Sequence, residues 1–277
     1  MVNKALQIYH NDSQLMNDAI DRIIVEIYGI KRNEGAKTFL FTGIGSSVGT
    51  TSVSLNIAIA LASAGWKTLF VDCDMRKNTR YKRLNSEDAD TLSLTEYLNI
   101  PHGVYAIEDI ICNTNYPLLD LITAGDGKDS PVRILCTDKM EKMVLTVRER
   151  YDFVIFDTPS INIVKDAEIL IPVVDRHILV AAINVSSKRQ LADARENLRM
   201  YHDRYAGLIV NRMDLHQYRD NIRDYDYFAQ SRLDKKHGDD MRKIEERERK
   251  RKKSEKHRKK GRGAKEKTAD NTYEEMK

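Results

Sequence analysis

The stretch GIGSSVGTT, residues 43–51, lies between a short apolar run (TFLFT, residues 38–42) and a helix-like run that ends at Gly65. Small residues in such a loop allow several backbone N–H groups to point at one anion, with the N-terminus of a helix behind it. The stretch is therefore typical of a phosphate-binding loop that follows the first strand of an α/β domain. An ordinary glycine-rich turn before a helix would read similarly, so the loop alone decides nothing.

Apolar runs and helix-like segments alternate around this loop, which predicts a doubly wound α/β domain with a mostly parallel sheet. The expected strands are residues 38–42, 68–71, 118–122, 153–156, 177–183 and 207–210. The expected helices are an amphipathic segment, 12–30, and three segments between the strands, 51–64, 134–148 and 189–201. Doubly wound sheets bind ligands at the carboxyl ends of their strands, where the connections reverse direction.

Two carboxylates follow the second expected strand, in the stretch TLFVDCDMRK at residues 68–77. Alternation along the chain places Asp72 and Asp74 on one side, where phosphate-bound Mg²⁺ would find oxygen ligands. Arg76 continues this alternation with a guanidinium group that suits a phosphate. Helix N-capping is the alternative, but it explains one aspartate and not the pair. We therefore expect Asp72 and Asp74 to be catalytic residues.

A third carboxylate, Asp157, ends the apolar run of YDFVIFDTPSINIVKDA at residues 151–167. A Walker-B-type aspartate holds the shell of the metal from this position, although a capped turn before Pro159 would look the same. The loop and the two aspartate motifs, on successive buried strands, predict a P-loop nucleotide site. The metal ligands expected there are Thr51, Asp74 and Asp157.

The loop departs from the usual pattern, G-x-x-x-x-G-K-[ST], at one position. Gly49 is in register and Thr51 supplies the hydroxyl group, but Thr50 stands where the lysine belongs. The loop residues expected to bind nucleotide are Gly45, Ser46, Ser47, Val48, Gly49, Thr50, Thr51 and Ser52.

The missing lysine favours binding over catalysis. Losing one charge-assisted hydrogen bond weakens nucleotide binding by about 10- to 100-fold. Losing one preorganised donor to the transition state costs roughly 100- to 1000-fold in rate. A replacement cation could come from Lys77, Arg76, Arg133 or a neighbouring subunit.

These motifs resemble those of the bacterial tyrosine kinase (BY-kinase) family over about residues 10–214. TLFVDCDMRK is similar to the family's second Walker motif, D-x-D-x-R, and YDFVIFDTPSINIVKDA is similar to its Walker B segment. The resemblance implies a P-loop NTPase of the deviant Walker A type, shared with ParA and MinD proteins, with ATP or ADP and Mg²⁺ as cofactors. It also places Asn211 and Arg212 near the nucleotide base. ParA and MinD proteins usually continue D-x-D-P-Q, whereas Met75 and Arg76 stand here, which favours the kinase branch.

The resemblance implies a function in capsule or exopolysaccharide biosynthesis: protein-tyrosine (auto)phosphorylation, with activity reduced or lost. Asp72 would orient or deprotonate the attacking tyrosine hydroxyl group. The implied partner is a membrane-embedded polysaccharide chain-length or activator protein, which would hold a cytoplasmic chain at the inner face of the membrane. The candidate phosphorylation sites are Tyr218, Tyr225, Tyr227 and Tyr273.

Three questions stay open from the sequence. An inactive regulatory or scaffold pseudokinase and a ParA/MinD-like ATPase are alternatives to the kinase. Self-association through the family's N-terminal E-x-x-R-x-x-R motif is also open, because Asp18, Asp21 and Ile24 stand where that motif has its Glu and two Arg residues.

Charge divides the chain into unlike parts. The net charge is +4, but residues 242–267 alone carry 15 Lys and Arg against 5 Asp and Glu, so the rest is acidic. We expect an N-terminal helix and linker (1–37), a nucleotide-binding domain (38–214) and a charged tail (215–277). The tail either contacts anionic membrane or nucleic acid, or only aids solubility. No apolar stretch approaches the roughly 20 residues that span a bilayer, and the three cysteines lack disulfide or metal spacing.

Overall fold

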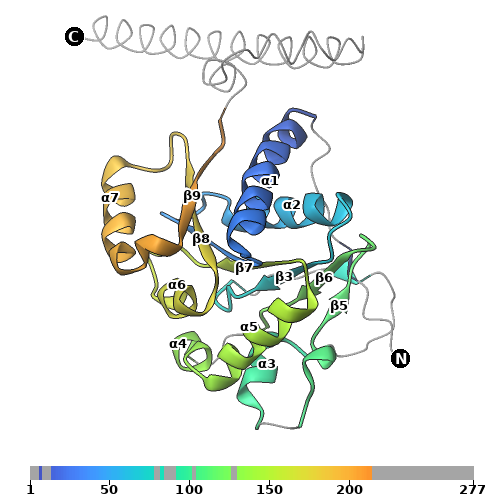
Figure 1. Ribbon diagram of the computed structural model, residues 1–277. Helices are drawn as coiled ribbons and strands as arrows, with labels where there is room; N and C mark the ends of the chain where they lie inside the picture. Colours follow the sequence, from blue (N-terminus) through green and yellow to red (C-terminus); the bar gives the residue numbers. More distant parts are fainter. Residues whose placement is uncertain are drawn as a thin grey trace, which may run out of the picture. The chain divides into compact units, whose positions relative to one another are not determined.

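The computed structural model describes the chain at residues 6–7, 14–77, 82–83, 92–101, 104–125 and 130–213 (Figure 1). The main sheet has seven strands, which in spatial order are β5 (Cys112–Asn113), β6 (Leu119–Ile122), β3 (Thr68–Asp72), β7 (Phe153–Thr158), β2 (Thr38–Gly43), β8 (Arg176–Ala182) and β9 (Tyr205–Asn211). Neighbouring strands are parallel except β5 and β6, which are antiparallel. The predicted α/β fold with a mostly parallel sheet is therefore confirmed. A second, two-stranded sheet pairs β1 (Leu6–Gln7) with β4 (Lys82–Arg83).

Helices cover both faces of the main sheet (Figure 1). The helices on one face are α1 (Gln14–Glu34) and α2 (Thr50–Ser63). The helices that contribute to the core on the other face are α3 (Leu94–Asn99), α4 (Pro131–Leu135), α5 (Asp138–Arg150), α6 (Asp166–Leu170) and α7 (Lys188–Asn197). Among the described residues, no helix combines the length and apolar character needed to span a membrane.

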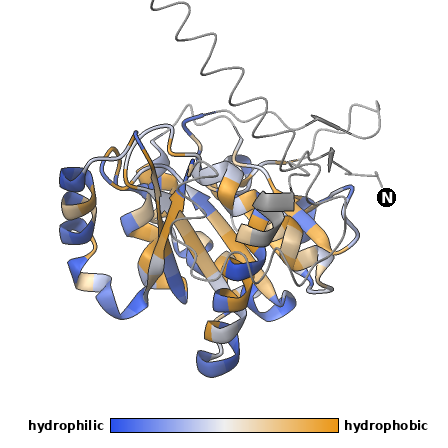
Figure 2. Cartoon of the chain, turned by 90° about the horizontal axis from the view of Figure 1, so that it is seen from above, coloured by the Kyte–Doolittle hydropathy of each residue, from blue (hydrophilic) through white to orange (hydrophobic). Residues whose placement is uncertain are grey.

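Alternate side chains of β2 enter two separate cores. Phe39 and Phe41 pack with α1 and α2, whereas Leu40 packs with the helices of the opposite face. All three side chains are fully buried. A strand buried on both faces reads as a continuous apolar run, which is why these strands are visible in the sequence. Figure 2 shows the strands of the sheet largely in the colour of hydrophobic residues.

The structure corrects two of the expected helices. The segment 134–148 is divided into α4 and α5 because Thr137 accepts a hydrogen bond from the Met140 N–H and so caps a new helix. The helix expected to reach residue 201 ends at Asn197 and continues as a 3₁₀ segment, Arg199–Arg204, in which Tyr201 is non-helical. The sequence also missed the short α3, α6 and β5, together with the 3₁₀ segments Ile107–Asp109 and Ile171–Val173, because elements this short show no periodicity.

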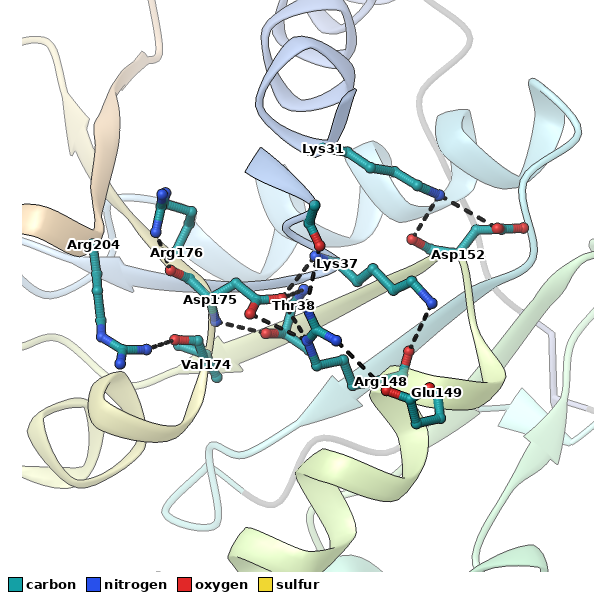
Figure 3. Close-up of polar contacts among 11 residues, drawn as sticks. Lys31, Lys37, Thr38, Arg148, Glu149, Asp152, Val174, Asp175, Arg176 and Arg204 are labelled. Carbon is teal, nitrogen blue, oxygen red and sulfur yellow. Dashed lines mark hydrogen bonds and ion pairs between the residues drawn. The ribbon is translucent and has the colours of Figure 1, made fainter. Parts of the chain in front are cut away.

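Ion pairs and hydrogen bonds tie down the amino-terminal edge of the sheet (Figure 3). The Asp175 carboxylate accepts hydrogen bonds from the backbone N–H groups of Lys37 (2.8 Å) and Thr38 (3.0 Å) and from Arg148 Nε (3.1 Å). Burial alone would raise the pKa of Asp175, but these donors outweigh it and hold the pKa below its usual value. Lys31 Nζ likewise binds the backbone oxygen (3.0 Å) and the carboxylate (3.3 Å) of Asp152. Every one of these groups joins elements that are distant in sequence, so the edge is a structural anchor.

Candidate functional site

The carboxyl end of β2 leads into the glycine-rich loop, and α2 begins directly after it at Thr50. Gly49 occupies the N-cap position with φ 88°, and no side chain caps the helix. By contrast, side chains of Ser93, Thr137 and Ser187 cap α3, α5 and α7. The N-terminal N–H groups of a 14-residue helix are therefore left without a side-chain acceptor. Together with the helix dipole, they favour an anion at this position.

The last residues of β9 hold the loop from one side. Asn211 Nδ2 donates a hydrogen bond to Val48 O (2.8 Å), and Arg212 Nη2 donates one to Ser47 O (2.6 Å). A Cβ atom at Gly49 would lie 2.5 Å from Asn211 Nδ2, so only glycine fits both this contact and the left-handed backbone there. The expectation that Asn211 and Arg212 lie near a nucleotide base stays a prediction, but both residues do contact the loop.

Asn162 and Gln190, which were not predicted from the sequence, also lie against the loop. Asn162 Nδ2 donates hydrogen bonds to Ile44 O (2.9 Å) and Gln190 O (2.7 Å). A Cβ atom at Gly45 would lie 2.8 Å from Gln190 Nε2, so the Gln190 side chain lies close against the loop. Tertiary contacts bring Asn162 and Gln190 to the loop, so their role cannot be predicted from the sequence pattern. The only sequence signal is that Asn162 lies within the motif that begins at Asp157.

A cavity of about 390 Å³ opens beside the loop. This volume lies within the range of small-molecule sites. Its lining residues are Gly45, Ser46, Ser47, Val48, Gly49, Thr50, Thr51, Ser52, Asp74, Arg76, Lys77, Thr158, Pro159, Ser160, Ile163, Val164 and Arg212. The structure thus brings the complete predicted loop together with Asp74 and Arg212. Asp72, Asp157 and Asn211 are not in the wall, and the tyrosines Tyr218, Tyr225, Tyr227 and Tyr273 lie outside the described residues.

Three buried carboxylates lie behind and beside the cavity. Asp72 and Asp157 are neighbours across the pairing of β3 with β7, and each is 1% exposed, while Asp74 is 2% exposed. Burial and the charge of Asp72 raise the pKa of Asp157 to about 8. Ser54 Oγ donates a hydrogen bond to Asp157 Oδ1 (3.2 Å), but Asp157 Oδ2 has no hydrogen-bond partner among the described residues. A buried carboxylate oxygen without a partner leaves a place for a bound water molecule or a cation.

The residues present fit Mg²⁺ better than a metal with an all-protein shell. Among the described residues, no group of three or more His, Cys, Asp or Glu side chains forms a ready-made metal site. Mg²⁺ typically takes only one or two carboxylates and completes its shell with water and substrate phosphates. Thr51 and Asp74, which line the cavity, and Asp157, with its unpartnered oxygen, are suitable for that arrangement.

The basic residues near the cavity differ in how they are held. Arg76 forms a two-pronged ion pair with Asp166, with both N–O distances 2.9 Å, and Asp166 is fully buried. Lys77 Nζ lies 2.7 Å from Asp74 Oδ2, and the Lys77 side chain is 62% exposed. Arg133 is exposed and is not part of the cavity wall. Of the candidates named from the sequence for the missing lysine, Arg76 and Lys77 therefore reach the cavity.

Comparison with known proteins finds relatives in sequence and in fold. Residues 43–185 match a family model described as an AAA domain. The chain is 32% identical over 179 residues to the tyrosine-protein kinase CpsD of Streptococcus pneumoniae, covering 65% of this chain and 77% of that protein. It is 31% identical over 175 residues to the tyrosine-protein kinase YwqD of Bacillus subtilis, covering 63% of this chain and 72% of that protein. A similar solved structure is the kinase domain of the Escherichia coli tyrosine kinase ETK, with a TM-score of 0.62, 23% identity and coverage of 70% of this chain and 74% of that one.

Proposed function

This chain belongs to the bacterial tyrosine kinase family, and we propose that it binds Mg·ATP or Mg·ADP in the cavity beside the glycine-rich loop. One observation carries the proposal. The N-terminus of α2 lacks a side-chain cap, and it opens on a cavity beside buried aspartates, one of which has an unpartnered oxygen. The site therefore suits an anion and a cation at one place, and a magnesium-bound nucleotide supplies both.

Each part of the site has a separate task in this proposal. The loop N–H groups and the N-terminus of α2 bind the phosphates. Thr51, Asp74 and Asp157 hold Mg²⁺, which neutralises charge on the phosphates when it is bound. Asn211 and Arg212 keep the loop in its anion-binding shape through the carbonyl groups of Val48 and Ser47, because a peptide whose oxygen is held has a fixed orientation.

We further propose that the chain phosphorylates tyrosine in the service of capsule or exopolysaccharide synthesis, with low activity because Thr50 replaces the lysine. Such catalysis is mainly positioning plus charge neutralisation. Asp72 Oδ1 accepts a hydrogen bond from the Asp74 N–H (3.0 Å) and lies outside the cavity wall. This contact supports a role for Asp72 in positioning Asp74, and direct contact with the tyrosine hydroxyl would require the turn after β3 to move.

The test uses the full chain with ATP and Mg²⁺, followed by detection of phosphotyrosine and of a fluorescent ADP analogue. We expect nucleotide binding, together with a phosphotyrosine signal that Asp74→Asn and Asp72→Ala both abolish. A variant in which Tyr218, Tyr225, Tyr227 and Tyr273 are all Phe should lose the signal if the tail is the acceptor, while it still binds nucleotide. A signal equal in the wild type and the aspartate variants would contradict the kinase.

A regulatory pseudokinase is the second candidate, and Thr50 is the observation that favours it. Nucleotide binding without phosphotyrosine or ADP release, in the presence of a membrane-embedded activator protein, would support this function. We propose such an activator as the partner in either case, with the chain at the inner face of the membrane. The basic tail is a candidate contact for anionic lipid or nucleic acid, and retention on vesicles or DNA that disappears at high salt would support it.

A further inference from the structure

We propose that Lys77 takes the place of the phosphate-binding lysine that the loop lacks: it pairs with Asp74 in the nucleotide-free protein and turns to the phosphates when Mg²⁺ occupies Asp74. The inference rests on the proposed nucleotide site and names the cation that completes it. It also assigns this cation to the turn after β3 rather than to the loop after β2.

The two arginines of the cavity wall already form hydrogen bonds with other parts of the protein. Arg76 binds Asp166 with two parallel hydrogen bonds, and its departure would leave a fully buried carboxylate unpaired. Such a loss is strongly unfavourable. Arg212 donates to Ser47 O and so helps to shape the loop. Either arginine would have to give up a contact that the fold or the loop uses.

Lys77 differs from the arginines because its partner, Asp74, is itself a proposed ligand of Mg²⁺, so the metal would pair with this buried carboxylate when the lysine moves away. Its ammonium group contacts Asp74 in the wall of the cavity, and its side chain is 62% exposed, so it can change rotamer without disturbing the core. The group is therefore a mobile positive charge at the edge of the site.

Binding of Mg·nucleotide itself supplies the reason for Lys77 to move. Asp74 is the lysine's partner and also a proposed metal ligand, and a hard divalent cation competes strongly with an ammonium group for carboxylate oxygen. A lysine that loses its carboxylate beside a triphosphate gains phosphate oxygens as new acceptors. Because the group is a flexible point charge with three donors, it needs no fixed geometry to make this exchange.

The experiment measures the dissociation constant of the full chain for Mg·ADP and for a non-hydrolysable Mg·ATP analogue. We expect Lys77→Met to weaken binding by about 10- to 100-fold, the loss of one charge-assisted hydrogen bond, and Lys77→Arg to stay within about threefold. The matched control is Lys165→Met, because Lys165 pairs with Glu168 at the same i,i+3 spacing and is 61% exposed, yet it lies outside the cavity wall. We expect this control to bind like the wild type.

The outcomes separate the two proposals. A wild-type chain that binds neither nucleotide would overturn the proposed function. A wild-type chain that binds, with Lys77→Met within twofold of it, would overturn the role of Lys77 and leave the nucleotide site standing. Melting temperatures within a few degrees across the variants show that the losses are not caused by unfolding.

A rescue variant distinguishes a phosphate contact from an effect of Lys77 on local structure. Thr50→Lys restores the lysine of the usual loop, so with it present the further loss on Lys77→Met should fall below about threefold. An equal loss with and without Thr50→Lys would mean that Lys77 does not act on the phosphates. If Thr50→Lys fails to fold, the comparison of Lys77→Met, Lys77→Arg and Lys165→Met decides alone.

Discussion

The two ends of the same sheet hold a carboxylate in opposite ways, one partly buried and one fully buried. At the amino-terminal edge, Asp175 receives three donors and its pKa lies below the usual value. At the carboxyl-terminal edge, Asp157 keeps one oxygen unpartnered and its pKa rises to about 8. The first carboxylate is satisfied within the chain, and the second is not. The carboxylate at the amino-terminal end of the strands therefore stabilises the fold, whereas the carboxylate at their carboxyl-terminal end is available to a ligand.

The largest expected effect is a loss of stability when Asp175, at the amino-terminal end of the strands, is replaced. Asp175→Ala should lower the free energy of unfolding by about 2–4 kcal/mol, because the N–H groups of Lys37 and Thr38 and the Arg148 guanidinium lose their acceptor. Urea unfolding at pH 7 measures this loss. The dissociation constant for Mg·ADP should stay within twofold of the wild type. Asp193→Ala is the control, since its pairing with Arg189 is long (3.9 Å) and exposed, and a loss as large as that of Asp175→Ala would contradict the comparison.

A smaller effect, of opposite sign, is expected at the ligand-binding edge. Asp157→Asn should raise the free energy of unfolding of the ligand-free chain by about 1–3 kcal/mol at pH 8, because it removes a buried charge of which one oxygen lacks a hydrogen-bond partner. The same change should weaken Mg·ADP binding by about 10- to 100-fold. Chemical denaturation and binding titrations measure the two quantities. A destabilised variant that binds nucleotide normally would make Asp157 an ordinary structural residue.

The smallest effect is a dependence on pH with two opposing parts. The pKa of Asp157 is raised from 3.8 to about 8, so the folded chain binds more protons than the unfolded chain between these values and stability falls as pH rises. Burial lowers the pKa of His177, a fully buried residue of β8, from 6.5 to about 4, so its contribution rises with pH across that window. Each contribution has a slope of at most about 1.4 kcal/mol per pH unit.

These signs give a direct measurement. The ligand-free wild type should lose stability between pH 6.5 and pH 8, because Asp157 contributes to the pH dependence in this range and His177 does not. Asp157→Asn should be flat over that range and should still gain stability between pH 4 and pH 6.5. Equal profiles for the two proteins would show that Asp157 is not a strained carboxylate.

The parts of the fold that could be predicted from the sequence were the strands that are recognisable from their own residues alone. Continuous apolar runs identified β2, β3 and β7, because these strands are buried on both faces. Aspartates at the ends of such runs then pointed to the correct edge of the sheet. The break at Thr137 was missed because both halves of the segment carry helical periodicity, although a threonine before Asp138 is itself a capping signal.

The contacts that complete the site could not be predicted, because they join residues that only the fold brings together. Asn162 and Gln190 reach the loop from two different connections. The sequence suggested that Arg76 is available to a phosphate, whereas the structure pairs it with Asp166, 90 positions further along the chain. Pattern and spacing predict which groups are near an edge, but the partner of each group depends on tertiary packing.

The bonds from Asn211 and Arg212 to the loop have a mechanical consequence. A shift of Val48 or Ser47 on ligand binding would move Asn211, the last residue of β9, and Arg212, which follows it, through these two hydrogen bonds. Occupancy of the loop would therefore change the position of the carboxyl end of β9.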